Sequence, residues 1–472
     1  MNNSKDPVIY WLREDFRIHD NLALTEAAKD SKNLMLVYFS NYLDKQPGSA
    51  QEVWINNSFL EITKKYHEIY GLNIQCYDGD PIQYLEELYK KFGVSEIYMN
   101  EVFDPRTKKK DDKIKKYFTD QIIFKTYNSH LLFNPEEIKN NAGSYFKVYT
   151  PFWRNCLSKL IIRKPLRPPK EINVFQDKRL KGIHDLSLNH SLWANRLFKY
   201  FTPGENAARL KLKELGNLIK GYSSNRDFPN KDSTSKFSMY FARGELSVNE
   251  VMFHLIRNKS KINKDDYIKF SSQIGWREFS YNILYNFPNL PLRNFNQKFD
   301  NFEWDTNKKN FNLWKSGQTG FPIVDAGMRE LYETGYMHNR VRMITASFLV
   351  KDLLIDWRLG RKWFEETLLD HDIANNSAGW QWVAGSGTDA APYFRIFNPS
   401  LQSERFDKEG SYIKKWIPEL KDLPSKLIHS PWKFHESDLK KYEIELGKTY
   451  PYPIIDHSNA RDKALMLYKK LK

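Results

Sequence analysis

The first 130 residues alternate short apolar runs with segments of helical periodicity. The apolar runs are Val8–Leu12, Leu34–Phe39, Ile74–Tyr77, Glu96–Met99 and Ile122–Tyr127. The helical segments between them include Asn21–Lys29, Asn57–Tyr70 and Pro81–Phe92. This alternation is typical of a doubly wound, Rossmann-like parallel sheet. No Gly-x-Gly-x-x-Gly motif follows the first run, so we do not expect this sheet to bind a dinucleotide in the usual way.

The pattern changes after the sheet. Between Leu131 and Thr202 it becomes irregular, with prolines among basic residues, which predicts a linker wrapped on the surface. From Pro203 onward apolar residues recur at helical spacing, as in Gly204–Leu218 and Arg340–Trp357. With 472 residues, the chain is longer than chains that fold around a single hydrophobic core. We therefore predict an α/β domain over residues 1–130, a linker over 131–202 and an all-helical domain over 203–472.

Charge and cysteine content narrow the class of protein. The chain has 73 basic and 58 acidic residues, a balance of +15 that favours a polyanionic partner without identifying it. The two cysteines, Cys76 and Cys156, make neither a disulfide framework nor a zinc site, so we expect no metal and a reducing compartment. No signal peptide or bilayer-spanning apolar run is present in the sequence. We expect a soluble, cytoplasmic monomer that does not contact a membrane.

The region from Trp357 to Pro399 carries the most unusual chemistry. Asp370, Asp372, Asn375 and Asn376 lie beside two of the chain's 13 tryptophans, Trp380 and Trp382. Packing explains most tryptophans, but buried carboxylates and amides need polar partners. A polar heterocycle or a cation is the natural partner, and a simple turn at the paired asparagines is the alternative.

Several blocks of sequence together resemble the photolyase and cryptochrome family. They are Tyr10–Asn21, Arg226–Pro229, Thr234–Ser238, Gly275–Phe279, Thr319–Arg329, Met337–Met343 and the region from Trp357 to Pro399. The resemblance is strongest to the class I cyclobutane pyrimidine dimer (deoxyribodipyrimidine) photolyases. It implies an α/β domain followed by a helical FAD domain, and light-driven repair of damaged DNA. In that reaction reduced FAD donates an electron to the dimer, the two bonds joining the pyrimidines break, and the electron returns.

The resemblance also implies which residues bind FAD. They are Tyr222, Thr234, Ser235, Lys236, Phe237, Ser238, Arg342, Asp370, His371, Asp372 and Asn376. Hydroxyls and amides of Thr234–Ser238 would hold the diphosphate, and a polar turn without function is the alternative. Arg342 would pair with Asp370, and Asn376 would face the reactive ring nitrogen. An asparagine there can donate or accept a hydrogen bond without adding charge, which favours repair over signalling.

Three tryptophans match the family's chain that carries electrons from the surface to the flavin. They are Trp380, Trp357 and Trp304, and together with Asn376 they are the predicted catalytic residues. Indole rings are oxidisable, so a spaced row of them can relay single electrons. Core packing is the alternative for each ring, and we expect Trp314 to be structural.

Photolyases extrude the damaged bases from the stacked DNA duplex. Two further tryptophans of this chain match the family's tryptophans that stack on the extruded dimer. These are Trp276 and Trp382, and Met343 would line the same pocket. The residues expected to hold the lesion and the DNA backbone are Arg226, Gln273, Arg277, Asn339, Arg340 and Gln402.

Two positions depart from the cyclobutane branch. Gln273 stands where a glutamate is usual, and a glutamine occurs there in six-four photolyases and animal cryptochromes. However, Met337–Arg340 lacks the paired histidines of the six-four branch, so we retain the cyclobutane assignment. Thr107 stands where a glutamate holds a folate antenna in one branch. A folate such as methenyltetrahydrofolate in another pose, a deazaflavin, or no antenna all remain open.

Two other classes of function are also open. A cryptochrome-type blue-light photoreceptor would use the same cofactor and tryptophans, but its signalling members often carry long polar tails. The given chain stops soon after the helical pattern Asn459–Leu471, which argues against a tail-driven signal. A non-catalytic DNA-binding module would purify without a flavin.

Overall fold

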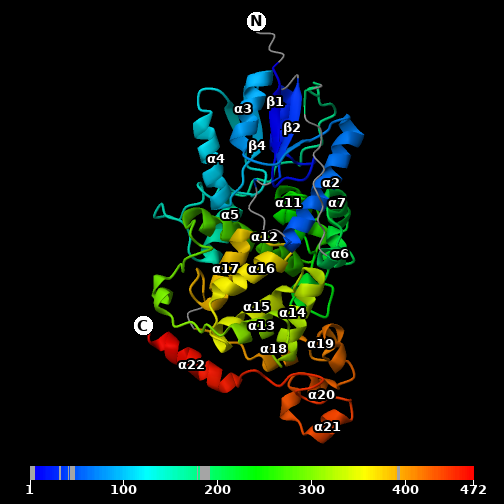
Figure 1. Cartoon of the computed structure of the whole chain (residues 1–472), viewed down its shortest axis with the longest axis vertical. Coiled ribbons are helices and arrows are strands. Elements are labelled where there is room, and N and C mark those ends of the chain that lie inside the picture. The colour runs from blue at the N-terminus through cyan, green and yellow to red at the C-terminus, as the bar shows by residue number, and fades with distance from the viewer. Residues whose placement is uncertain are drawn as a thin grey trace. The chain divides into compact units, whose positions relative to one another are not determined.

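The computed structural model describes residues 6–30, 33–40, 42, 48–177, 179–180, 192–390 and 394–471. The chain divides into two compact units, which are described separately. Unit 1 comprises Met1–Tyr145, Pro151–Lys220 and Ser235–Tyr285, and unit 2 comprises Phe146–Thr150, Gly221–Thr234 and Asn286–Lys472. Figure 1 labels the helices and strands used below.

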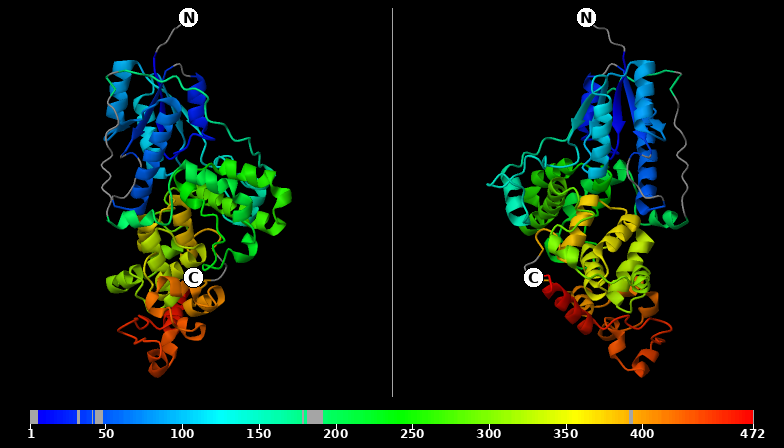
Figure 2. Two further views of the ribbon diagram at one scale, coloured as in Figure 1. Left: turned by 90° about the vertical axis from the view of Figure 1, so that its right-hand side faces the viewer. Right: turned by 60° about the vertical axis from the view of Figure 1, so that its left-hand side comes forward.

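Unit 1 contains a five-stranded parallel sheet in the order β3-β2-β1-β4-β5. Its strands are β1 (Val8–Leu12), β2 (Leu34–Phe39), β3 (Gln75–Tyr77), β4 (Glu96–Asn100) and β5 (Ile123–Tyr127). The helices that connect them are α1 (Leu22–Asp30), α2 (Ala50–Tyr70), α3 (Pro81–Phe92) and α4 (Pro105–Tyr117). Helices lie on both sides of the sheet (Figure 2), as parallel sheets require. The predicted fold class is confirmed.

Alternate residues of β1 enter two different apolar cores, one on each face of the sheet. Tyr10 and Leu12 belong to one core, whereas Ile9 and Trp11 belong to the other. Burial on both faces explains why the strands were visible as continuous apolar runs. Helix α4 escaped prediction because it is rich in lysine and buries only Thr107, Asp111 and Ile114.

The structure differs from the predicted surface linker over residues 131–202. This segment contains α5 (Tyr149–Ser158) and α6 (Leu192–Leu197). In α5, Phe152, Trp153 and Cys156 are buried. A Cβ atom at Gly275 would lie 2.5 Å from the ring of Trp153, so only a glycine allows this contact. Helix α5 is therefore packed into unit 1.

Unit 1 contains further helices beyond the sheet and α5 and α6. These are α7 (Glu205–Lys213), α8 (Leu215–Leu218), α10 (Ser238–Ala242), α11 (Val248–Arg257), η1 (Lys259–Lys261) and α12 (Lys264–Asn286), whose last residue lies in unit 2. The predicted helical segment Gly204–Leu218 is interrupted at Glu214, which ends α7 and precedes α8.

Within its described part, unit 2 has helices as its regular secondary structure, apart from isolated bridges. Its α-helices are α9 (Tyr222–Asn225), α13 (Lys308–Lys315), α14 (Pro322–Thr334), α15 (Asn339–Ser347), α16 (Trp357–Thr367), α17 (Ile373–Ala384), α18 (Pro399–Phe406), α19 (Ser411–Trp416), α20 (Ser425–Ile428), α21 (Glu436–Lys440) and α22 (His457–Lys469). The 3₁₀ turns are η2 (Gln297–Asn301), η4 (Pro418–Leu420) and η5 (Pro431–Lys433). The predicted helix Arg340–Trp357 is interrupted, because α15 passes into a π-helical turn, η3 (Phe348–Asp352), and Leu354 has a φ of 54°. No described helix is both long and apolar enough to cross a bilayer.

Two buried carboxylates explain why helices beyond the sheet belong to unit 1. Asp20, in the β1–α1 turn, accepts hydrogen bonds from the Leu166 backbone N–H at 3.0 Å and the Ser247 hydroxyl at 2.5 Å. Glu205 accepts from the His19 backbone N–H at 2.9 Å and pairs with Lys65 at 2.5 Å. Because these contacts tie helices α7 and α11 to the sheet, the compact units do not coincide with the limits at residues 130 and 202, which stay predictions.

The Glu205 carboxylate should make the stability of unit 1 depend on pH. Burial raises its pKa, but hydrogen bonds from His19 and the charge of Lys65 outweigh burial and lower the pKa to about 2. A carboxyl with a lowered pKa stabilises the fold above its unfolded pKa, and this stabilisation is lost as the pH falls toward its folded pKa. We expect the free energy of unfolding of the wild type to fall by about 2 kcal/mol more than that of Glu205→Gln between about pH 6 and pH 3.

Urea unfolding at each pH measures this difference. Glu214→Gln is the matched control, because Glu214 is exposed and next to the same helix. Its pH profile should follow the wild type. Parallel profiles for wild type and Glu205→Gln would contradict the assignment.

Candidate functional site

The N-terminus of α17 arranges three predicted residues in a row. Asp372 caps the helix, and its side chain accepts a hydrogen bond from the Asn375 backbone N–H at 2.8 Å. Asn376 and Trp380 follow at intervals of four residues, so they lie on the same side of the helix as the cap. A carboxylate, a carboxamide and an indole therefore line one face of α17.

Arg342 on α15 holds the carboxylate that precedes this helix. Its Nη2 donates to both oxygens of Asp370, at 3.0 and 2.9 Å, and its Nε donates to the Met337 carbonyl at 2.7 Å. The pair that the resemblance implied is thus present. Burial lowers the pKa of Arg342, but the charge of Asp370 and the hydrogen bond to it outweigh burial and raise the pKa, so the guanidinium stays charged.

The side chain of Asn376 is held in one orientation by two neighbours. Its Nδ2 donates to the Arg361 carbonyl at 3.0 Å and lies 3.1 Å from Nδ1 of His371, which is 6% exposed. Within the described part of the chain no donor reaches Asn376 Oδ1. The half-buried amide therefore presents a carbonyl oxygen, an acceptor for an N–H group of a ligand.

Helices α16 and α17 approach closely beside this amide. A Cβ atom at Gly360 would lie 2.2 Å from the Trp380 ring, so a larger residue would force the helices apart. Trp380 is 2% exposed and packs edge-on against Phe364, with ring centroids 4.9 Å apart. Its indole N–H has no hydrogen-bond partner among the described residues.

The other two predicted relay tryptophans differ in exposure. Trp357 is buried and donates its indole N–H to Asn294 Oδ1 at 2.9 Å, whereas Trp304 is half-buried against Phe302. Burial therefore decreases from Trp380 and Trp357 to Trp304, as a relay from the surface requires. Trp314, which we predicted to be structural, is buried and donates its indole N–H to the Thr345 carbonyl. Its ring centroid lies 6.2 Å from that of Trp380.

Two predicted DNA-binding arginines of unit 2 share one acidic partner. Asp227 lies 3.0 Å from Arg340 and 3.7 Å from Arg226. Arg340 also stacks over Phe406 at 4.2 Å, and Gln402 lies one turn before Phe406 on α18. The structure thus brings Arg226, Arg340 and Gln402 together. Sequence reasoning assigned no role to Asp227, although it directly follows Arg226.

The first turn of α15 presents Asn339 and Met343. His338 caps this helix by accepting from the Arg340 backbone N–H at 3.2 Å. Burial lowers the pKa of His338 to about 4, which keeps the ring neutral and able to accept. Asn339 is exposed, and its Nδ2 lies 3.8 Å from the sulfur of Met343. The cap leaves both side chains available to a ligand.

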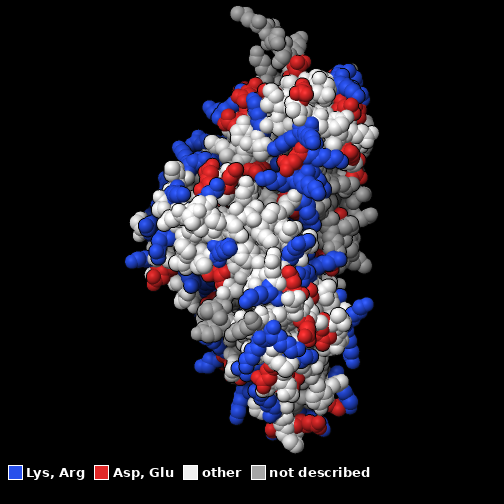
Figure 3. All heavy atoms as spheres, turned by 90° about the vertical axis from the view of Figure 1, so that its left-hand side faces the viewer, with Lys and Arg blue, Asp and Glu red and all other residues white. Residues whose placement is uncertain are grey.

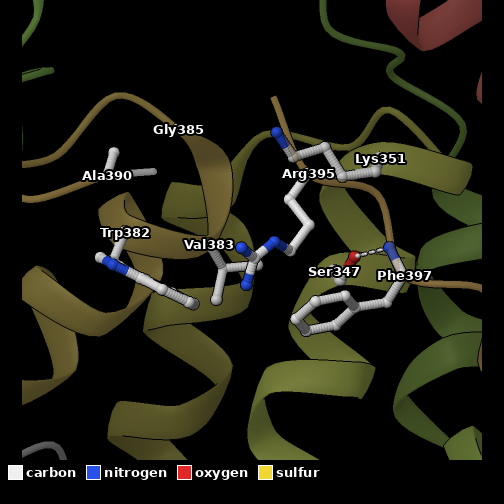
Figure 4. Close-up of a pocket in the computed structure, with 8 residues that line it drawn as sticks. All are labelled: Ser347, Lys351, Trp382, Val383, Gly385, Ala390, Arg395 and Phe397. Carbon is white, nitrogen blue, oxygen red and sulfur yellow. Dashed lines mark hydrogen bonds between the residues drawn. The ribbon is translucent and has the colours of Figure 1, made fainter. Parts of the chain in front are cut away.

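A pocket opens beside Trp382 at the other end of α17 (Figure 4). It is lined by Ser347, Lys351, Trp382, Val383, Gly385, Ala390, Arg395 and Phe397. The Trp382 N–H donates to the Asp389 carbonyl at 3.0 Å. Lys351 is buried, which lowers its pKa, and it donates to the Ala384 carbonyl at the end of the helix. Sequence reasoning missed Lys351 and Arg395, which both line this pocket.

Unit 1 carries the remaining predicted lesion contacts on α12. Gln273 and Trp276 are half-buried, and the Gln273 amide donates to Ser272 Oγ at 3.2 Å. Arg277 is 7% exposed, donates to the His130 carbonyl at 3.1 Å and stacks over Tyr281 at 4.9 Å. Its guanidinium is occupied inside unit 1, so we leave Arg277 out of the proposed DNA contacts.

The predicted diphosphate segment crosses the boundary between the units. In unit 2, Thr234 Oγ1 lies 3.4 Å from the hydroxyl of Tyr336, and Tyr222 is buried beneath Arg226. In unit 1, Lys236 has a φ of 55° and the Ser235 hydroxyl accepts from the Phe237 N–H at 3.4 Å; Ser238 begins α10. Lys236, with its left-handed backbone, turns the chain between Ser235 and Ser238. Such a turn between hydroxyl groups is suited to an anion.

On the face in Figure 3, lysine and arginine residues are interspersed with acidic ones. With a balance of +15, the chain can attract a polyanion.

Comparison with known proteins supports a common origin for this site. Residues 8–170 match the DNA photolyase family, and residues 270–470 match the FAD binding domain of DNA photolyase. A deoxyribodipyrimidine photo-lyase of Agrobacterium fabrum is 41% identical over 99% of this chain and 98% of its own length.

Two solved structures are also similar over nearly the whole chain. A bacterial class III photolyase from Agrobacterium tumefaciens has a TM-score of 0.94 and 40% identity, covering 100% of this chain and 98% of its own. A cryptochrome of Synechocystis has a TM-score of 0.90 and 28% identity, covering 99% of this chain and 100% of its own. The sequence motifs suggested class I, whereas one of these two similar structures is a class III photolyase. The chain belongs to the DNA photolyase and cryptochrome family.

Proposed function

We propose that this protein is a photolyase that repairs cyclobutane pyrimidine dimers in DNA under blue light, with FAD as its cofactor. The observation that carries the proposal is the Asn376 carbonyl oxygen, presented without a described protein donor beside Asp372 and Trp380. The relative of 41% identity is named a deoxyribodipyrimidine photo-lyase, which supports the same reaction here. When bound, reduced FAD supplies the light-driven electron that opens the dimer.

The residues of unit 2 fit a flavin. Asp372 and Asn376 offer oxygen acceptors to ring N–H groups, while Arg342 is held in place by both carboxylate oxygens of Asp370. Thr234 is the one residue of the predicted diphosphate segment that belongs to this unit, beside Tyr336. The chain's own contribution is to hold and orient the cofactor.

The DNA contacts are proposed from residues whose side chains stay accessible. Trp276 and Trp382 are half-buried rings that can stack on the bases of a lesion. Arg226 and Arg340 can exchange their shared partner Asp227 for phosphate. Asn339, Met343, Gln402 and Gln273 complete the set as proposed lesion or backbone contacts.

A light receptor of the cryptochrome type is the second candidate, favoured by the similarity to the Synechocystis protein. The absence of repair in light, with flavin bound, would select it. A second chromophore stays a proposal, and the glutamate-type folate contact is disfavoured because Thr107 is buried in α4. We also propose a monomer in a reducing cytoplasm, consistent with Cys76 and Cys156 as buried free thiols.

The wild type should purify with bound FAD, and Asp372→Ala should lower flavin occupancy at least about tenfold, because it removes a charged acceptor and a helix cap together. Flavin absorbance per protein measures this. Asp456→Ala is the matched control, since Asp456 caps α22 with the same bond to the third residue, here Asn459. The control should lose stability without losing flavin. Equal occupancy in both variants would contradict the site.

Trp380→Phe should block light-driven reduction of oxidised flavin while leaving repair by chemically pre-reduced enzyme largely intact. A relay is needed only to refill the flavin, and phenylalanine is much harder to oxidise than tryptophan. Absorbance changes under blue light with an external reductant measure the rate. Trp432→Phe, which changes a half-buried indole packed on Phe321, should behave as the wild type. A wild-type rate of photoreduction in Trp380→Phe would exclude the path.

Gln273 gives the test of lesion preference. Its amide can hydrogen-bond a thymine edge, but it cannot supply a proton to a dimer that has accepted an electron, so the electron should return more often before the bonds break. We expect the wild type to repair cyclobutane dimers in light and not in darkness. Gln273→Glu should raise the yield per absorbed photon, because a carboxyl group can supply the proton that the amide cannot. Flavin binding should not change.

Cyclobutane and six-four substrates should be assayed in parallel. Repair of six-four lesions in place of cyclobutane dimers would assign the protein to the other branch. A lower cyclobutane yield in Gln273→Glu would show that repair uses the Gln273 amide directly.

A further inference from the structure

His371 stands between two carboxylates, Asp370 and Asp372, in the turn that leads into α17. The ring is 6% exposed, so its contacts with the protein determine its role. One of these contacts is with Asn376, whose Nδ2 lies 3.1 Å from His371 Nδ1. This contact requires an unprotonated Nδ1, because only a bare ring nitrogen accepts a hydrogen bond from an amide N–H.

The second partner of the amide lies on the neighbouring helix. The Arg361 carbonyl of α16 accepts from the same Nδ2 at 3.0 Å. Both amide hydrogens are therefore directed at acceptors, a ring nitrogen and a backbone carbonyl. Rotating the amide by half a turn would place Oδ1 against the Arg361 carbonyl, which cannot donate, and against His371 Nδ1, which could donate to it only in the other tautomer of the ring. The two contacts consequently select a single orientation.

This orientation has a chemical consequence for the cofactor. A reduced flavin carries an N–H donor at the ring nitrogen that is a bare acceptor in the oxidised flavin. A carbonyl oxygen pairs with the donor, whereas an amide N–H pairs with the acceptor. The side of Asn376 that faces the cofactor therefore discriminates between the two oxidation states without any change in charge.

We infer that His371 is a positioning residue, which fixes the Asn376 carbonyl oxygen toward the cofactor and so favours reduced FAD. The inference rests on the proposed function, because it requires FAD next to Asn376. His371 has two charged neighbours in the sequence, Asp370 and Asp372. Two ion pairs also lie around the site, Arg342 with Asp370 and Arg361 with Glu365. Their charges are the same in the variants below, so those variants test the amide orientation alone.

The test compares His371→Leu and His371→Asn in alkaline buffer, where imidazole is neutral. Leucine fills a buried volume without an acceptor, while asparagine can place an oxygen near the position of Nδ1. The measurement is the ratio of reduced to oxidised FAD at one fixed potential, read by absorbance in the dark and without DNA. We expect His371→Leu to lower this ratio about fivefold, the effect of one hydrogen bond, and His371→Asn to stay within about twofold of wild type.

A double-mutant cycle separates positioning from general damage. In an Asn376→Ala background, His371→Leu should change the ratio no further, because there is no amide left to orient. His371→Ala should give the same loss as His371→Leu through a smaller side chain, so that a packing defect of one variant does not decide the result.

An equal ratio in wild type and in both acceptor-free variants would overturn the inference and leave the proposed function intact. The same loss in the Asn376→Ala background, or in His371→Asn, would also overturn it. A wild type that takes up no FAD would overturn the proposed function and the inference with it.

Discussion

The close approach of α16 and α17 is the constraint on which the candidate site depends. Gly360 allows the Trp380 ring to lie where any side chain would collide, with a Cβ contact of 2.2 Å. The next residue, Arg361, then brings its carbonyl to within 3.0 Å of the Asn376 amide. One glycine thus fixes both the burial of a predicted relay tryptophan and the orientation of the residue predicted to face the flavin.

Polar groups in this protein are mostly held by other protein groups before any ligand arrives. Arg342 is fixed on Asp370, and Arg340 and Arg226 share Asp227. Such pairing limits the rotamers of long side chains, so less conformational entropy remains to be lost on binding. One exception is the carbonyl oxygen of Asn376, an acceptor that no described donor reaches and that is therefore left for a ligand.

The sequence predicted the sheet well, because strands buried on both faces appear as unbroken apolar runs. The sequence did not reveal α4, because its many lysines leave only three buried positions and no clear apolar pattern. It also predicted one helix over Arg340–Trp357, where η3 and the left-handed Leu354 interrupt a regular apolar pattern. In the site, the resemblance gave the Arg342–Asp370 pair. It could not give the Arg361 carbonyl or its role, since a backbone group leaves no signature in the residue type.

The central claim is that light absorbed by bound flavin drives the repair of cyclobutane dimers. The action spectrum tests it most directly, as the rate of dimer loss per incident photon across the near-ultraviolet and blue. We predict that this spectrum follows the absorption of the reduced flavin in the same preparation, with added bands only if a second chromophore is bound. Dimer loss in darkness, or a spectrum unrelated to the bound chromophores, would contradict the account.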